Sequence, residues 1–328
     1  MKRTWILATA SLAAMAMASG AQAADKYVVG VSNTLIGNGW REEMICSIKA
    51  EAEASGKVSK VVVANRNGGP SEQIADIRNL ISAGANIIII NPSDREALNP
   101  VIKQAADKGI VVVAVDQAVS APEAYVLTND QVEYAKLGGK GSVVEMRGID
   151  GVPADADRHE GFTEVAKNYP DIKVTSVFSG WALDKTAQQT KNLLASGKPI
   201  DGVWTSGIDS TVVDAYKTAG KPFVPVVGAD NNGFIGQLID LKDKGLSGAA
   251  VSNPPAVGAA GLSLALDVLA KKQEPHLIKI TPSVWDNGAG LSELKAAYNP
   301  KLDPFFSVAT VPPYTHYTPE QLIACKGP

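Results

Sequence analysis

Planar polar side chains and tryptophans stand directly after apolar runs along this sequence. Carboxylates, carboxamides and guanidinium groups can bind hydroxyl groups through paired hydrogen bonds, and an indole ring offers a flat apolar face. This mixture suits a sugar or small polyol, whose hydroxyls donate and accept and whose C–H faces are apolar. Asx residues are also common turn formers, so only the whole set is informative. Its members are Asn33, Asn38, Trp40, Arg41, Asn91, Asp116, Gln117, Arg147, Trp181, Asp209, Asp230 and Asn253.

Signals for covalent, phosphate or metal chemistry are missing from the sequence. The turn Gly37-Asn38-Gly39 has Glu at position 42, where a dinucleotide fingerprint needs its third glycine. The glycine-rich run 138–142 precedes an apolar run and lacks the GK[ST] ending of a phosphate loop. No G-x-S-x-G nucleophile elbow occurs, and the two cysteines and three histidines show no metal-ligand spacing. We therefore expect a binding protein that is not an enzyme, with no cofactor and no metal.

The elements that must position the polar set alternate between short apolar runs and longer amphipathic segments. The apolar runs are continuous, which indicates parallel strands buried on both faces by helices. Strand–helix alternation at this spacing predicts a doubly wound α/β fold, in which ligands bind beyond the carboxyl ends of the strands. Strands are predicted at 27–32, 58–64, 87–90, 110–115, 142–146, 172–178, 202–205 and 224–227. Helices are predicted at 41–54, 71–83, 95–108, 157–169, 184–195, 210–219, 235–244 and 258–272.

The alternation restarts after Thr128, which indicates a second unit of the same kind. Between the two units, residues 130–141 leave room for a helix of only about two turns, at 131–137, close to the minimum for a crossover between parallel strands.

The N-terminus has the pattern of a secretory signal peptide. Lys2 and Arg3 precede an uncharged run from 5 to 17, and Ala21-Gln22-Ala23 forms a small-x-small cleavage site. The uncharged run is shorter than the roughly 20 apolar residues of a membrane span. The mature chain would carry 29 basic and 34 acidic residues without a basic stripe, so neither nucleic acid nor an anionic membrane is an expected partner. We expect cleavage after Ala23 and a periplasmic, monomeric protein.

The segment 283–328 is rich in proline and aromatic residues and resembles neither unit. It is expected to form an ordered tail packed on the body. In an oxidising compartment an even number of cysteines favours a disulfide between Cys46 and Cys325, which would hold this tail on the first unit. The bond is not expected to touch the sugar, so its reduction should lower the melting temperature and leave the affinity nearly unchanged. The alternative is two free thiols, which fits the apolar surroundings of Cys46 better than those of Cys325.

Several stretches resemble the ribose-binding-protein type of periplasmic sugar-binding proteins of ABC transporters. They are Val29-Gly30-Val31-Ser32, Ile90-Asn91-Pro92-Ser93-Asp94, Val115-Asp116, Arg147-Gly148-Ile149-Asp150-Gly151, Arg158-His159-Glu160-Gly161-Phe162 and Val227-Gly228-Ala229-Asp230. The first loop, Asn38-Gly39-Trp40-Arg41, is similar to that of the galactofuranose-binding branch.

The resemblance implies two Rossmann-like domains joined by three hinge crossings, near Thr128, Asn253 and Ile280, with the ligand in the cleft between them. The implied organisation is a signal peptide at 1–23, one lobe from 24–128 plus 254–280, a second lobe from 129–253 and a tail from 281–328. The resemblance implies sugar contacts for Asn91, Asp116, Arg158, Asp230 and Asn253, and an aromatic contact for Trp181. The complete candidate set is Asn33, Asn38, Trp40, Arg41, Asn91, Asp116, Gln117, Ile149, Arg158, Trp181, Asp209, Asp230 and Asn253.

Two departures from the family pattern keep the ligand open. Gln117 stands where an arginine is common, and Gly207 stands where an asparagine is common, with Asp209 as a possible substitute. A monosaccharide or small polyol delivered to the permease of an ABC importer is the predicted function. A receptor that presents the sugar to a chemoreceptor or sensor kinase would share every feature and remains the alternative.

Overall fold

The computed structural model describes residues 26–129, 141–307 and 309–328, and it contains two six-stranded sheets. The predicted signal peptide and the predicted helix at 131–137 lie outside the described residues. The first sheet has the order β11 (Leu277–Ile280), β5 (Tyr125–Asn129), β4 (Val111–Val115), β3 (Ile87–Ile90), β1 (Tyr27–Asn33), β2 (Val58–Asn65). The second has the order β12 (Val284–Asp286), β10 (Gly248–Val251), β9 (Val226–Ala229), β8 (Gly202–Thr205), β6 (Gly141–Arg147), β7 (Ile172–Phe178).

All the pairs in these sheets are parallel except that of β10 with β12. The predicted α/β class with two doubly wound parallel sheets is thus confirmed. Each sheet with its helices is called a lobe below. The first lobe contains α1 (Gly39–Ser55), α2 (Pro70–Ser82), α3 (Asn99–Ala106) and α8 (Val257–Leu269). The second contains α4 (Pro153–Ala166), α5 (Leu183–Ala195), α6 (Asp209–Thr218), α7 (Asn232–Asp240), the short 3-10 helix η2 (Lys242–Lys244) and α9 (Leu291–Ala297).

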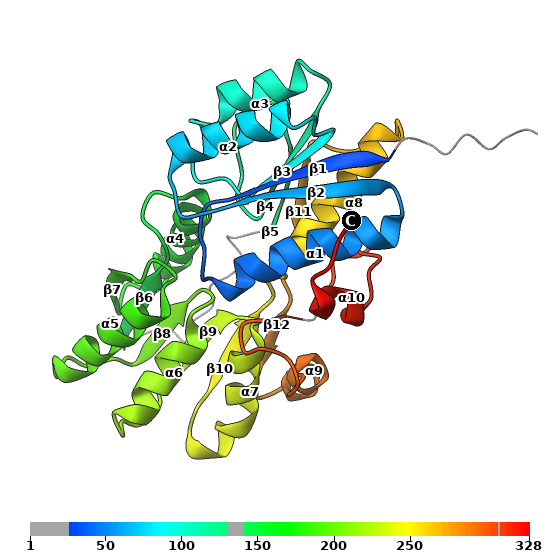
Figure 1. Ribbon diagram of the computed structural model, residues 1–328. Coiled ribbons are helices and arrows are strands. Elements are labelled where there is room, and N and C mark those ends of the chain that lie inside the picture. The colour runs from blue at the N-terminus through cyan, green and yellow to red at the C-terminus, as the bar shows by residue number, and fades with distance from the viewer. Residues whose placement is uncertain (1–25, 130–140, 308) are drawn as a thin grey trace, which may run out of the picture.

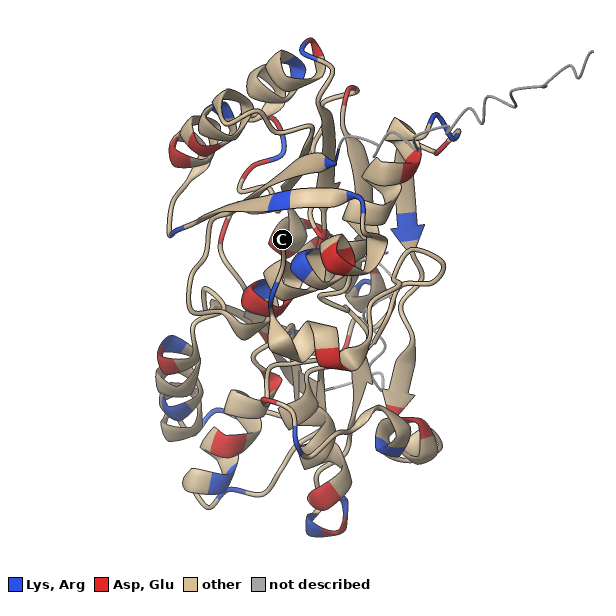
Figure 2. Cartoon of the chain, turned by 45° about the vertical axis from the view of Figure 1, so that its right-hand side comes forward, with Lys and Arg blue, Asp and Glu red and all other residues tan. Residues whose placement is uncertain are grey.

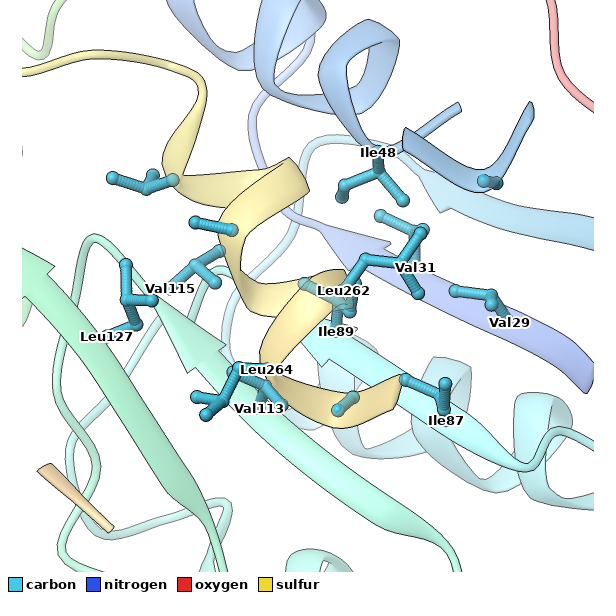
Figure 3. Packing of buried hydrophobic residues seen from close by; sticks show 14 of the residues in the cluster. Val29, Val31, Ile48, Ile87, Ile89, Val113, Val115, Leu127, Leu262 and Leu264 are labelled. Carbon is cyan, nitrogen blue, oxygen red and sulfur yellow. The ribbon is translucent and has the colours of Figure 1, made fainter. Parts of the chain in front are cut away.

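Strand β3 shows why the apolar runs are continuous. Ile87 and Ile89 pack into the core beneath α1 and α8, whereas Ile88 and Ile90 pack into the core beneath α2 and α3. Figure 3 shows the first of these cores, with Leu262 of α8 lying over Ile89. Successive strand residues point to opposite faces, so a strand covered on both sides must be apolar throughout.

The chain passes between the lobes several times. Strand β5 belongs to the first sheet and β6 to the second, β10 leads back to α8, and β11 leads forward to β12. A fourth passage follows. Helix α9 packs on α7 of the second lobe, whereas α10 (Pro319–Ala324) packs on α1 of the first lobe, as Figure 1 shows.

The expected tail therefore needs a correction at its start. Strand β12 pairs with β10 and belongs to the second sheet, so the segment from 284 begins as part of the second lobe. A three-residue strand is too short to leave a periodic signal in the sequence.

Two predicted boundaries also differ from the structure. The helix expected at 157–169 begins earlier, at Pro153, which occupies its first turn. The strand expected at 224–227 lies instead at Val226–Ala229.

Lys and Arg positions are interspersed with Asp and Glu positions along both lobes in Figure 2. No helix within the described part of the chain is long and apolar enough to cross a membrane.

Candidate functional site

A cavity of two adjoining pockets lies between the lobes, where the carboxyl ends of both sheets meet. Asn38 and Trp40 come from the start of α1, and Trp181 comes from the loop after β7. These three residues line both pockets, as do Gly207 and Ala229. The remaining lining residues are Gly37, Gly39, Arg41, Asp116, Arg158, Leu183, Ser206, Asp230, Asn231, Asn253, Phe305 and Ser307.

The first-lobe wall is built at the N-terminus of α1. Asn38 is the cap residue of this helix, and its side chain accepts a hydrogen bond from the backbone N–H of Arg41 at 3.1 Å. The indole N–H of Trp40 donates to the carbonyl oxygen of Asn253 at 2.6 Å. Arg41 is buried and donates to Asn33 Oδ1 at 3.0 Å. Burial lowers the pKa of Arg41 to about 10, against the attraction of Asp116, so the guanidinium stays charged at neutral pH.

Asp116 forms the charged centre of the cavity together with Arg158. It follows β4 in a left-handed backbone conformation, with φ of 64°, and the guanidinium of Arg158 lies 3.6 Å from its carboxylate. Both side chains are more than nine-tenths buried. The Nδ2 atom of Asn253 lies 3.5 Å from the same carboxylate. A carboxylate and two donors from three separate segments therefore converge on one point.

Trp181 supplies the second-lobe wall. It too has a positive φ, 53°, and its indole N–H donates to Ser206 Oγ at 3.3 Å. The guanidinium of Arg158 stands 5.8 Å from the centre of its ring. Gly148 lies directly beneath the ring, and a Cβ atom there would overlap it. The glycine thus allows the indole to lie flat over the end of β6.

Asp230 follows β9, and its carboxylate accepts hydrogen bonds from two other segments. Its Oδ1 accepts from the backbone N–H of Asn253 at 2.8 Å, and its Oδ2 accepts from the hydroxyl of Ser307 at 2.8 Å. Burial raises the pKa of Asp230, an effect that these two hydrogen bonds oppose.

Five of the predicted ligand-binding residues do not line the cavity. Ile149 packs against the core of the second lobe. Asn91 and Gln117 form a buried hydrogen bond with each other, in which Nε2 of Gln117 donates to Oδ1 of Asn91 at 2.5 Å. Asn33 is bonded to Asn65, at 2.7 Å, and to Arg41. Asn33 thus supports the lining residue Arg41, and direct contact of any of these residues with a ligand stays a prediction.

Asp209 is the fifth of these residues and lies at the start of α6. Its carboxylate accepts from Asn231 Nδ2 at 2.5 Å and from the backbone N–H of Gly207 at 3.2 Å. Burial nevertheless raises its pKa to about 6. Arg147, which the sequence analysis also noted, does not line the cavity. Its guanidinium forms an ion pair with Asp155, whose Oδ2 lies 2.5 Å from Nη2 of Arg147.

Sequence reasoning missed Phe305 and Ser307, which reach the cavity from the segment after α9. No local pattern marks them, because their place depends on contacts with residues more than 70 positions away. Leu183 and Ser206 were also missed. Both follow strands of the second sheet, but the sequence analysis selected only planar polar side chains and tryptophans at strand ends, and leucine and serine are neither.

The lobes touch one another around the cavity. Arg95 of the first lobe and Asp157 of α4 form an ion pair at 2.5 Å, and both are partly exposed. Deeper in, the backbone N–H of Ala154 donates to Oε1 of Gln117 at 3.1 Å. The site residues of the two lobes are therefore in contact in this structure.

Comparison with known proteins agrees with this geometry. The model of the periplasmic binding protein domain matches residues 29–273. The chain belongs to this family. It is 32% identical over 222 residues to the xylitol-binding protein of Mycolicibacterium smegmatis, a match spanning 63% of each chain and thus just under two thirds of that relative's length.

Two further members extend the comparison. The galactofuranose-binding protein of Escherichia coli is 30% identical over 245 residues, which cover 67% of this chain and 74% of the relative. Among solved structures, an ABC transporter solute-binding protein from Thermobispora bispora superposes with a TM-score of 0.77 at 29% identity, over 91% of this chain and 94% of that one. The predicted membership among the sugar-binding proteins of ABC transporters is confirmed.

Proposed function

We propose that this protein captures a monosaccharide or small polyol in the cavity between its lobes and delivers it to the permease of an ABC importer. The observation that carries the proposal is the meeting of Arg41, Asp116, Arg158 and Asn253 in one buried cavity between lobes. Relatives that bind xylitol and galactofuranose support a ligand rich in hydroxyl groups.

In this proposal the lining residues have distinct tasks. Trp40 and Trp181 stand on opposite lobes and would offer ring faces to the C–H surfaces of the ligand. The carboxylate of Asp116 and the guanidinium of Arg158 would share the hydroxyls, because one accepts and the other donates. Closure then excludes water, so each hydroxyl must find a partner in the protein.

Further parts of the proposal concern where and how the protein works. We propose that the signal peptide directs it to the periplasm, where it acts as a monomer without cofactor or catalytic activity. The relatives are binding proteins, which supports this reading. Domain closure about the crossings near Thr128, Asn253 and Ile280 would join the two halves of the site.

The direct test is a thermal-shift screen of the purified mature protein against pentoses, hexoses and polyols, followed by calorimetry. Xylitol, D-ribose, L-arabinose, D-fructose and D-galactose form the first panel. A ligand present at 100 times its Kd adds about 2.7 kcal/mol to the stability of the folded state, which is readily seen as a higher melting temperature. A panel without any stabilising compound would contradict the proposal.

A second measurement separates transport from sensing. Deletion of the chain's gene should abolish uptake of the labelled ligand at low concentration. If uptake persists and only a chemotactic or transcriptional response to the ligand is lost, the chain is a receptor instead.

A further inference from the structure

The segment 303–307 runs along the edge of the cavity and is bonded to the second lobe. The backbone N–H of Gly233 donates to the carbonyl oxygen of Pro304 at 2.7 Å, and that of Asn232 donates to the carbonyl oxygen of Phe306 at 2.8 Å. A Cβ atom at Gly233 would lie 2.9 Å from Cβ of Pro304. The start of α7 therefore holds this segment through its backbone, at a point where only glycine leaves room.

Phe305 projects from this segment toward the first lobe. It lies against Gly39, where an added Cβ atom would overlap the phenyl side chain. It also lines the same pocket as Asn38, Trp40 and Trp181. A third aromatic side chain thus stands beside the two tryptophans, supplied by neither sheet but by the segment after α9.

Ser307 fixes the segment between the lobes. Its backbone N–H donates to Oε2 of Glu43 on α1 at 3.0 Å, and its hydroxyl donates to Oδ2 of Asp230 at 2.8 Å. Ser307, Glu43 and Asp230 are all buried. One residue therefore joins a carboxyl group of the first lobe to a carboxyl group that lines the cavity.

Beyond this point the chain is attached to the first lobe. His316 donates its backbone N–H to Glu51 of α1 at 2.8 Å, and Cys325 lies at disulfide distance from Cys46 of the same helix, with Cα atoms 4.5 Å apart. The backbone N–H of Val61 donates to the carbonyl oxygen of Pro328 at 3.0 Å. These contacts support the predicted disulfide and place the anchor directly after the residues that reach the cavity.

We propose that Phe305, carried by the segment 303–307, forms a third wall of the ligand pocket and is a specificity-determining residue. This inference rests on the proposed function, because it names the wall that limits the size of the sugar or polyol. The phenyl ring fills space at the end of the cavity beside Gly39. On this proposal the phenyl side chain limits the room beside Gly39, so a ligand with a further exocyclic carbon at that end would meet it, whereas a shorter pentitol or pentose would not. This proposal replaces the expectation that reduction of the disulfide leaves the affinity nearly unchanged, because the segment before Cys325 lines the cavity.

The test compares Phe305→Ala with Phe306→Ala. Phe306 is the matched control, because it is the adjacent phenylalanine and lines a neighbouring cavity instead. Calorimetry measures Kd for the best wild-type ligand of the panel and for the other compounds. We expect Phe305→Ala to weaken binding of the best ligand at least tenfold and to shift the order of preference toward hexoses. Phe306→Ala should keep the wild-type order and a Kd within about threefold.

Three outcomes distinguish the possible failures. If the wild type binds and Phe305→Ala has the wild-type Kd and order of preference, the third wall is refuted and the proposed function stands. If both variants weaken binding equally, with no change of order, the segment only braces the lobes and Phe305 does not determine specificity. If the wild type binds no compound of the panel, the proposed function fails, and this inference with it. Circular dichroism of both variants confirms that they are folded before Kd is compared.

Discussion

Replacement of Glu43 by glutamine should stabilise the protein at neutral pH. Glu43 is buried on α1, and its carboxyl group accepts from Ser307 N–H and lies near Asp230, Asp303 and Tyr317. Burial raises its pKa from 4.5 to about 9, with the charges of Asp230 and Asp303 adding to the effect. The carboxyl group is therefore neutral in the folded protein at pH 7 and ionised in the unfolded chain.

The sign and size of the effect follow from proton linkage. A folded-state pKa above that of the unfolded chain means that stability is fully present below pH 4.5 and falls as the pH rises toward 9. Each pH unit in this window is worth ~1.4 kcal/mol. At pH 7 the loss amounts to about 3 kcal/mol. Glutamine resembles the neutral acid, keeps an acceptor for Ser307 and has no proton to lose, so Glu43→Gln should recover most of this free energy.

Urea unfolding followed by circular dichroism at pH 5, 7 and 8.5 measures the effect. The difference in unfolding free energy between the variant and the wild type should grow with pH, since the other titrating groups cancel in the difference. Glu53→Gln, an exposed position on the same helix, serves as the control and should show no such trend. A Glu43→Gln variant with the same pH dependence as the wild type would refute the reasoning, because it would mean that Glu43 is ionised in the folded state.

Three other predictions concern the cavity and the tail. Trp40→Ala should weaken binding at least tenfold in a calorimetric titration while the far-ultraviolet spectrum is retained, since large aromatic side chains in pockets are typical affinity anchors; normal binding would mean that the pocket lies elsewhere. Asp230→Ala leaves Ser307 and the Asn253 N–H without their acceptor at a cost of about 1–3 kcal/mol, so a Kd raised about tenfold is expected by the same method. Cys46→Ser should lower the melting temperature, since a loop of this length contributes at most about 5 kcal/mol in the chain-entropy model. It should also raise Kd severalfold, because the segment that it frees lines the cavity. An unchanged Kd would mean that the disulfide does not influence the position of the residues that line the cavity.

Much of the fold followed from the sequence because its signals are local. Runs such as 87–90 are apolar throughout only if both faces are covered, and this requirement selects a parallel sheet between helix layers. The first loop could be placed because Asn38, Trp40 and Arg41 directly follow β1, and the carboxyl ends of parallel strands meet at one edge. The short strands β5, β11 and β12 were not expected, since their three to five residues include polar or charged ones and form no continuous apolar run such as 87–90.

The division between residues that face the cavity and residues behind it could not be read from the sequence. Asn91 and Asp116 both follow a central strand, yet Asn91 is turned to Gln117 whereas Asp116 faces Arg158. Asp116 has a positive φ, which residue order alone does not reveal. Similarly, the place of Phe305 depends on pairings across long separations, such as the 279 positions between Cys46 and Cys325.

The long separation between the two cysteines determines the order in which parts of the protein can form. Cys46 lies on α1, the first helix of the described residues, whereas Cys325 follows the strands of both sheets in the chain. Among the described residues, the core of the second lobe contains no buried residue beyond α9, whereas the core of the first lobe includes Val311 of the tail, with Tyr314 and Tyr317 packed against it. The cavity gains Phe305 and Ser307 only when the segment after α9 has returned to α1. A chain cut short after α9 would lack Val311 in the core of the first lobe and Phe305 and Ser307 in the cavity. On the proposed function, ligand affinity would therefore depend on the segment after α9 being present and attached to α1.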